Sequence, residues 1–151
     1  MMAVVATAVM TLGEIFGPGA GDLAGIEIKD IVLDSRQVSP GAAFLALQGA
    51  DHHGLKYAED ALARGAVAVV YEPPAGDCIA PAGGIPVPNL RQDLGAIARQ
   101  FFALTADSLR LTGVTGTNGK STVAYLVANA QSLGGAPCNY LGTLGCGVPP
   151  D

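Results

Sequence analysis

The sequence predicts an α/β protein, because segments with strand character alternate with segments of helical periodicity. Three observations support this prediction. Residues 66–71 form a strongly apolar run of the strand type, and residues 90–102 place apolar side chains on one helical stripe. A glycine-rich stretch at 113–122 lies between an apolar run and a second helical pattern, which is the context of a phosphate-binding loop.

Strands and helices alternate before the glycine-rich stretch. Strand character is found at residues 26–33, 43–47 and 66–71, and helical spacing is found at 57–62 and 90–102. Loops are expected at 49–54 and at 73–84, where glycine and proline gather. Residues 85–88 carry two prolines, which confines them to a sheet edge or a connector. Residues 105–108 are the expected linker to the glycine-rich stretch.

Composition and charge argue against several classes of protein. Half of the 151 residues are apolar, which suffices for a core. The net charge is −5 and no basic run is present, so no nucleic-acid surface is expected. Residues 1–10 are too few to span a bilayer and lack the basic region of a secretory signal, so no membrane insertion is expected. Cys78, Cys138 and Cys146 lack metal-ligand spacing, which favours reduced thiols in the cytoplasm.

The stretch G-V-T-G-T-N-G-K-S-T at 113–122 predicts nucleotide binding. Gly116 and Gly119 carry no Cβ, so the backbone can turn tightly and approach phosphate oxygens. The start of the following helix favours an anion, Lys120 can reach the β- and γ-phosphates, and the Ser121 hydroxyl can hold Mg²⁺. Val114 departs from the usual pattern, which has glycine there. The residues predicted to bind the nucleotide are Gly116, Thr117, Asn118, Gly119, Lys120, Ser121 and Thr122.

The glycine-rich loop comes late in this chain. A strand is expected at 109–114, a helix at 123–133, and a further strand and turn at 139–145. A parallel sheet needs more strands before both of its faces are covered. We therefore expect residues 108–151 to be the incomplete start of a nucleotide-binding domain, less stable than the first domain. The first domain is expected at residues 1–107, of which 1–9 are an extension.

Two motifs, whose order along the chain is that of the family, resemble the Mur ligase family. The glycine-rich stretch is similar to the ATP loop of these enzymes. The segment Leu33-Asp-Ser-Arg36, with the Ser-Pro-Gly, Phe-Leu-Ala-Leu and glycine that follow it up to Gly49, is similar to their uridine-nucleotide-binding stretch. Residues 141–145 resemble the strand after the loop helix. The resemblance implies an N-terminal UDP-binding α/β domain followed by the first strand, P-loop and helix of an ATPase domain.

The resemblance implies an ATP-dependent amide ligase of peptidoglycan and cell-wall biosynthesis. The sequence is most similar to the branch of the family that adds the third amino acid. ATP would phosphorylate the D-Glu carboxylate of UDP-MurNAc-L-Ala-D-Glu, and the amine of meso-diaminopimelate or L-lysine would attack the acyl phosphate. Lys120 would be catalytic, since its charge would neutralise the transferred phosphoryl group together with Mg²⁺ held by Ser121. The family commonly has threonine where Ser121 stands, and both residues supply a hydroxyl.

The resemblance also implies which residues contact the UDP-sugar. They are Leu33 and Ser35 in the first segment, and Ala50, Asp51 and His52 in the loop after Gly49. An alternative interpretation of Asp34 and Arg36 is a surface ion pair in a turn at the end of a strand. His52 and His53 are expected to be solvated loop residues rather than metal ligands, because adjacent side chains point in different directions and no cysteine or carboxylate cluster accompanies them.

Two alternatives remain open at the level of the sequence. A different P-loop enzyme would hydrolyse a nucleotide without any UDP-sugar. A non-catalytic UDP-sugar-binding module would bind uridine nucleotides without ATP turnover. This chain alone is expected to be inactive as a ligase, because the parts that the family uses for the dipeptide, the incoming amino acid and the second Mg²⁺ are not among its residues.

Overall fold

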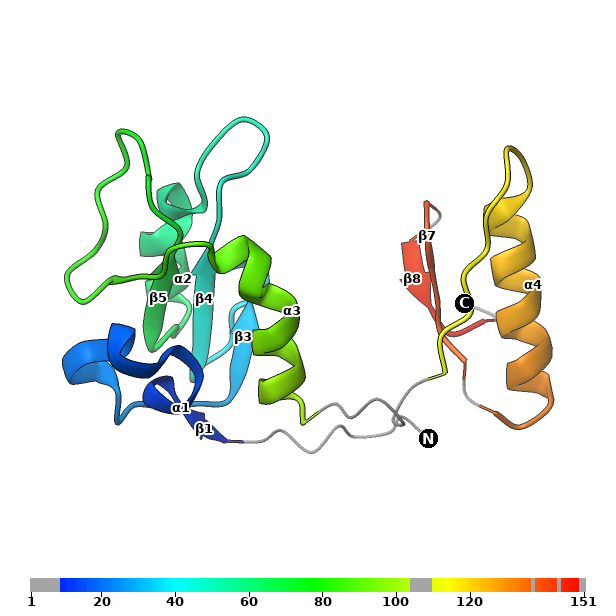
Figure 1. The fold of residues 1–151 in the computed structure, drawn as a ribbon, viewed down its shortest axis with the longest axis horizontal. Helices are drawn as coiled ribbons and strands as arrows, with labels where there is room; N and C mark the ends of the chain where they lie inside the picture. Colours follow the sequence, from blue (N-terminus) through cyan, green and yellow to red (C-terminus); the bar gives the residue numbers. More distant parts are fainter. Residues whose placement is uncertain (1–8, 104–109, 137, 144, 150–151) are drawn as a thin grey trace. The chain divides into compact units, whose positions relative to one another are not determined.

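A computed structural model describes residues 9–103, 110–136, 138–143 and 145–149 of the chain (Figure 1). The chain divides into two compact units, Met1–Ser108 and Leu109–Asp151, which are called the first and the second unit below. The expected extension at 1–8 and the expected linker at 105–108 lie outside the described residues. Among the described residues, no helix has the length and apolar character needed to cross a membrane.

The first unit is built on a parallel sheet of four strands. Its order is β3 (Asp30–Val32), β4 (Ala42–Ala46), β5 (Ala68–Tyr71) and β6 (Ile85–Pro86). Every residue of β4 is buried, as expected of a central strand covered on both faces. The predicted edge position of the proline-containing segment is confirmed, because β5 is the one strand that pairs with β6 in the described part of the chain.

Alternate residues of a strand point to opposite faces of the sheet. In the first unit, helices cover both of these faces. Leu45 and Val70 belong to a core cluster that includes residues of α1 (Leu12–Phe16) and α3 (Leu90–Phe101). Phe44 and Val69 belong to a second cluster, with Ala58 and Ala61 of α2 (Ala58–Ala63). The predicted α/β class is therefore confirmed, as are the helices expected at 57–62 and 90–102 within a few residues at their ends.

The strand predicted at 26–33 is in fact two short strands in different sheets. β2 (Glu27–Ile28) pairs antiparallel with β1 (Met10–Thr11), whereas β3 joins the main sheet. The break lies at Lys29, whose N–H donates to the Gly41 carbonyl oxygen at 2.9 Å. Neither α1 nor the 3₁₀ segment η1 (Gly17–Leu23) that follows it was predicted from the sequence.

The second unit consists of α4 (Lys120–Leu133) and a hairpin of β7 (Tyr140–Gly142) and β8 (Gly145–Gly147). The hairpin matches the strand and turn predicted at 139–145. The strand predicted at 109–114 is wrong for its described part, since residues 110–114 form no strand. A strand requires a ladder partner, and β7 and β8 pair with each other instead.

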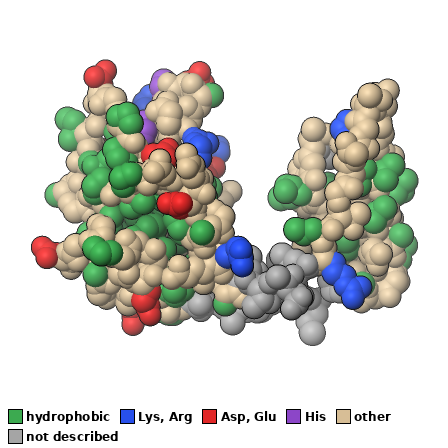
Figure 2. Space-filling model, viewed as in Figure 1, with side chains coloured by type: hydrophobic (Ala, Val, Ile, Leu, Met, Phe, Trp, Pro, Cys, Tyr) green, Lys and Arg blue, Asp and Glu red, His purple; other side chains and the backbone are tan. Residues whose placement is uncertain are grey.

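Much of the apolar surface of the second unit is exposed, as predicted for a sheet that lacks further strands. Leu111 is 90% exposed, and Leu133 and Leu141 are also largely open to solvent. Ala128 is the one buried residue of α4. Figure 2 shows hydrophobic side chains on the surface of this unit. Its described part therefore has only a small core of its own.

Candidate nucleotide-binding sites

Both segments predicted to contact the UDP-sugar leave the sheet at one edge. Leu33 directly follows β3, and residues 48–53 follow β4 as a loop, called the 48–53 loop below. β3 and β4 are parallel neighbours, with Val32 opposite Phe44, so their carboxyl ends meet at the same edge. Figure 1 shows the loop extending beyond the end of β4. The carboxyl edge of such a sheet is where α/β proteins bind their ligands.

A short 3₁₀ turn, η2 (Ser35–Gln37), shapes the first segment. Asp34 caps it, because its Oδ1 accepts the Arg36 N–H at 3.0 Å. The Arg36 guanidinium also lies 2.7 Å from Asp34 Oδ2. The alternative interpretation of these two residues as an ion pair in a turn is therefore confirmed as a description of their geometry. Leu33, beside this pair, is 55% exposed and so accessible to a ligand.

The Asp34–Arg36 pair makes a testable prediction about pH. Hydrogen bonds from Arg36 lower the pKa of Asp34 from 3.8 to about 2. Since the folded-state pKa is the lower one, the ionised pair stabilises the fold above pH 3.8, and this contribution is lost as the pH falls toward 2. Arg36→Ala should return the pKa of Asp34 toward 3.8, as read from a carboxyl-carbon NMR titration. Arg64→Ala is the control, because Arg64 acts on Asp34 only through weak Coulombic attraction. An unchanged pKa in Arg36→Ala would contradict this assignment.

Ser35 is one of two polar residues that are buried in the described structure, with 7% of its surface exposed. Its hydroxyl lies against α2, where a hydrogen bond with Asp60 lowers the pKa of that carboxyl. This effect on the pKa is larger than that of the hydrogen bond from Arg64. Arg64 Nε donates to Asp60 Oδ1 at 3.0 Å. Ser35 thus connects the carboxyl edge of β3 and β4 to α2, and its direct contact with a nucleotide stays a prediction.

The 48–53 loop is closed at its base by backbone hydrogen bonds. Gly49 N–H donates to the His52 carbonyl oxygen at 2.9 Å, and Gly54 N–H donates to that of Leu47 at 2.7 Å. A Cβ on Gly54 would lie 3.0 Å from the backbone of Ala46, which explains a glycine here. Closure leaves Ala50, Asp51 and His52, the three predicted contact residues, exposed at the tip. Figure 2 shows histidine and basic side chains near this end of the first unit.

The prediction that both histidines are solvated is wrong for His53, which is only 4% exposed. Its Nε2 lies 2.9 Å from the Glu72 carbonyl oxygen, and its Nδ1 accepts the Leu55 N–H at 3.1 Å. Nδ1 therefore carries no proton, and Nε2 is the donor to Glu72. The sequence could not show this, because Glu72 is 19 residues away. Within the described residues no group of three potential metal ligands occurs, at His53 or elsewhere.

Glu72 and Arg91 were not predicted from the sequence to belong to a site, and both lie at the carboxyl edge of the sheet, next to the 48–53 loop. Glu72 Oε1 accepts the Arg91 N–H at 3.0 Å, near the start of α3. The Arg91 side chain donates from Nη2 to the Gln48 carbonyl oxygen in the loop. Glu72 N–H donates to Ala46 at the end of β4 at 3.1 Å. The end of β5 thus joins β4, the 48–53 loop and α3.

The glycine-rich loop brings the predicted ATP residues together at the start of α4. Gly119 precedes this helix with φ of 75°, and Gly116 has φ of 145°, conformations that favour glycine. The Lys120 ammonium donates to the carbonyl oxygens of Gly116 at 2.5 Å and Thr117 at 3.2 Å, within its own loop. Thr117, Asn118 and Thr122 are exposed.

The Ser121 hydroxyl lies 2.8 Å from the Thr143 hydroxyl in the turn between β7 and β8. No role was predicted for Thr143 from the sequence. A serine hydroxyl is a hard oxygen donor of the kind that Mg²⁺ accepts, and Mg²⁺ in such sites takes its remaining ligands from phosphates and water. Ser121 therefore fits the metal role predicted for it.

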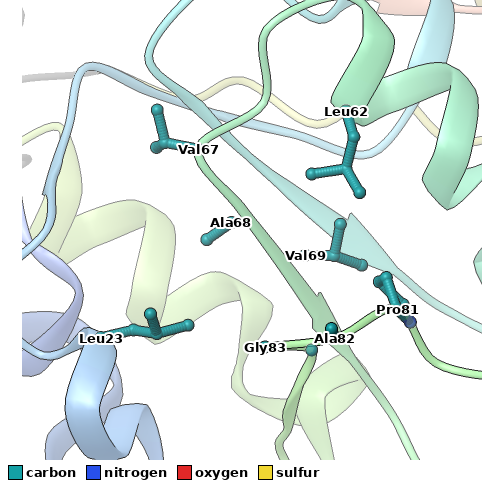
Figure 3. A pocket seen from close by; sticks show the side chains of 9 residues that line it. Leu23, Leu62, Val67, Ala68, Val69, Pro81, Ala82 and Gly83 are labelled. Atoms are coloured by element: carbon teal, nitrogen blue, oxygen red, sulfur yellow. The ribbon is translucent and has the colours of Figure 1, made fainter.

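A cavity of about 120 Å³ lies along the part of β5 that β6 does not cover (Figure 3). It is lined by Leu62, Val67 and Val69 and by the segment 81–84, among others. These side chains offer a nucleotide no charge and no hydrogen-bond donor. The cavity is therefore not a candidate for either nucleotide.

A model of the Mur ligase family, described as its catalytic domain, matches residues 27–102, half of the chain. The chain is 47% identical over 124 residues to the UDP-N-acetylmuramoyl-L-alanyl-D-glutamate--2,6-diaminopimelate ligase of Xanthomonas oryzae pv. oryzae (strain MAFF 311018). That alignment covers 82% of this chain and 25% of the relative. The chain thus spans about a quarter of the length of the curated relatives it matches first.

Solved structures support the same assignment. A structure of a ligase of the same name matches with a TM-score of 0.65 and 30% identity, covering 95% of this chain and 30% of that one. The MurF ligase of Thermotoga maritima in complex with ADP matches with a TM-score of 0.52 and 27% identity, covering 69% of this chain and 23% of that one. On the strength of the family match over residues 27–102, the chain belongs to the Mur ligase family.

Proposed function

We propose that the first unit binds the uridine nucleotide of UDP-MurNAc-L-Ala-D-Glu at the carboxyl edge of β3 and β4. One observation carries this proposal: Leu33 and the exposed tip of the 48–53 loop follow two adjacent parallel strands at that edge. Leu33 offers an apolar surface for a base, and Asp51 offers a carboxylate to its donors. Ala50 and His52 complete the proposed contacts, with Ser35 behind them.

The second unit, in this proposal, supplies the ATP loop of the same enzyme. Residues 116–122 would surround the triphosphate with backbone N–H groups at the start of α4. Lys120 would exchange its contacts with Gly116 and Thr117 for phosphate oxygens. Mg²⁺ held by Ser121 would neutralise charge on the phosphates. One of the matching solved structures is a MurF ligase in complex with ADP, which supports an adenine nucleotide as a ligand of the whole enzyme.

The proposed reaction of the whole enzyme is ATP-dependent amide formation in peptidoglycan synthesis. The D-Glu carboxylate takes the γ-phosphoryl group of ATP, and the amine of the third amino acid displaces phosphate from the acyl phosphate. The names of the relatives favour 2,6-diaminopimelate as that amino acid. A cytoplasmic location is part of the proposal, consistent with three free cysteines. The 151-residue polypeptide by itself should form no tripeptide.

Calorimetric titration of the chain with UDP-MurNAc-L-Ala-D-Glu, UDP, ATP and GTP tests this proposal. Both uridine ligands should bind saturably. Ser35→Ala combined with Asp51→Ala should weaken them by about tenfold or more, because a hydrogen bond to a charged group contributes about 1.5–3 kcal/mol. Asp22→Ala, which removes an exposed carboxylate from η1, is the matched control and should leave binding unchanged.

Two results of this titration would contradict the proposal. Binding of ATP or GTP with no response to any uridine ligand would indicate a P-loop protein of another kind. Uridine binding that weakens equally in Asp22→Ala and in the double variant would show that the loss does not come from contacts at the carboxyl edge of β3 and β4.

A further inference from the structure

We propose that His53 is a positioning residue, whose buried imidazole holds the 48–53 loop in the conformation that presents its tip. The inference rests on the proposed function in so far as the tip contacts a nucleotide. Ala50, Asp51 and His52 are exposed, so their own surroundings do not fix them. Whatever orders the tip must act at the base of the loop, where His53 adds two side-chain hydrogen bonds to the backbone bonds that close it.

His53 is joined to the fold through both ring nitrogens. Nδ1 accepts the Leu55 N–H and so caps the 3₁₀ turn η3 (Gly54–Tyr57), while Nε2 donates to the Glu72 carbonyl oxygen at the end of β5. The first bond is local, whereas the second crosses to another strand. Of these two bonds of His53, only the one to Glu72 can hold the loop in place relative to β5.

The opposite end of the loop is tied to the same point of the fold. Gln48, which faces His53 in an isolated antiparallel bridge, accepts a hydrogen bond from the Arg91 side chain. The Arg91 N–H in turn donates to the Glu72 carboxylate at 3.0 Å. Both ends of the loop are therefore connected to Glu72, one through its carbonyl oxygen and one through its side chain. Burial of the histidine ring excludes the water that would compete for its bonds.

Two substitutions of His53 separate its two bonds. In His53→Gln the amide nitrogen reaches the position of Nε2 and can still donate to Glu72, but the acceptor at Nδ1 is lost. In His53→Asn the side-chain oxygen takes the place of Nδ1 and can still cap η3, but it is too short to reach Glu72. A merely structural role in the core would affect both variants alike.

Amide hydrogen exchange and UDP titration of the wild-type chain and both variants test the inference. The Gly49 N–H, bonded to His52 within the loop, is the reporter. His53→Asn should accelerate its exchange by about tenfold and weaken UDP binding, whereas His53→Gln should keep both close to the wild type. Equal exchange rates of Gly49 in the two variants would overturn the role of the Glu72 bond.

The exchange reporter needs no ligand, so the inference and the proposed function can fail separately. A wild-type chain that binds no uridine ligand would overturn the proposed function, while Gly49 exchange would still decide the role of His53. If UDP binds and Gly49 exchange differs as expected, but both variants bind UDP equally, the loop is held by His53 without presenting the nucleotide contacts, and the positioning role is wrong.

Discussion

Replacing Phe44 by alanine is expected to lower the free energy of unfolding of the first unit by about 3–5 kcal/mol. Phe44 is 1% exposed at the centre of β4, and it belongs to the cluster that joins β4 to α2 and η3. Truncation would remove the apolar contacts of the ring and leave a cavity between rigid elements. Since domains are stable by only about 5–15 kcal/mol, much of the stability of this unit would be lost.

Urea denaturation followed by circular dichroism would measure this loss. Phe44→Leu is the matched control, because it keeps most of the volume and should cost no more than about 1.5 kcal/mol. Uridine binding should also weaken under conditions in which Phe44→Ala is partly unfolded. The reason is that α2 carries Asp60, the hydrogen-bond partner of Ser35. A smaller loss of unfolding free energy in Phe44→Ala than in Phe44→Leu would mean that the cluster around Phe44 does not support the first unit.

Replacing Lys120 by methionine should weaken ATP binding by about tenfold or more, because one charge-assisted contact to phosphate contributes about 1.5–3 kcal/mol. Methionine keeps a flexible stem of similar size and removes the charge. Arg110 is the only other lysine or arginine in residues 109–151. Neutralisation of the charge of a bound triphosphate by the second unit therefore depends heavily on Lys120. Fluorescence titration with a labelled ATP analogue would measure the change.

Arg110→Gln is the matched control for Lys120, since it removes the other positive charge of the second unit. It should change ATP affinity far less, because Arg110 lies outside the glycine-rich loop. UDP affinity should be the same in both variants. Equal loss of ATP affinity in the two variants would show general charge attraction instead of a phosphate loop.

The parts of the fold that the sequence predicted are those in which local pattern and long-range burial agree. The apolar stripe that begins at Leu90 gives α3, whose buried residues are Leu90, Ile97 and Phe101. The apolar run at 66–71 gives β5, and the prolines at 85–88 place β6 at the edge. Each of these patterns reports a physical constraint that acts within a few residues.

The parts that were missed depend on partners far away in the chain. The burial of His53 follows from Glu72, and the contact of Arg91 with Gln48 joins residues 43 apart. Neither leaves a periodic signal. One missed element did have a local signal, because Thr11 and Glu14 form a capping box at the start of α1.

The strand predicted before the glycine-rich loop is absent from residues 110–114 for a different reason. Residues 110–114 have a suitable sequence, but a strand exists only where another strand completes its hydrogen bonds. No described residue pairs with them. A sequence pattern can show that a segment is able to form a strand, but not that a partner strand is present.

Backbone amide NMR of the chain during titration with UDP tests the central claim most directly. The predicted result is saturable chemical-shift change at residues 33–36 and 49–53, which surround the carboxyl edge of β3 and β4. Changes confined to the glycine-rich loop at 113–122, or to the segment 81–84 at the apolar cavity, would contradict the assignment of the uridine site.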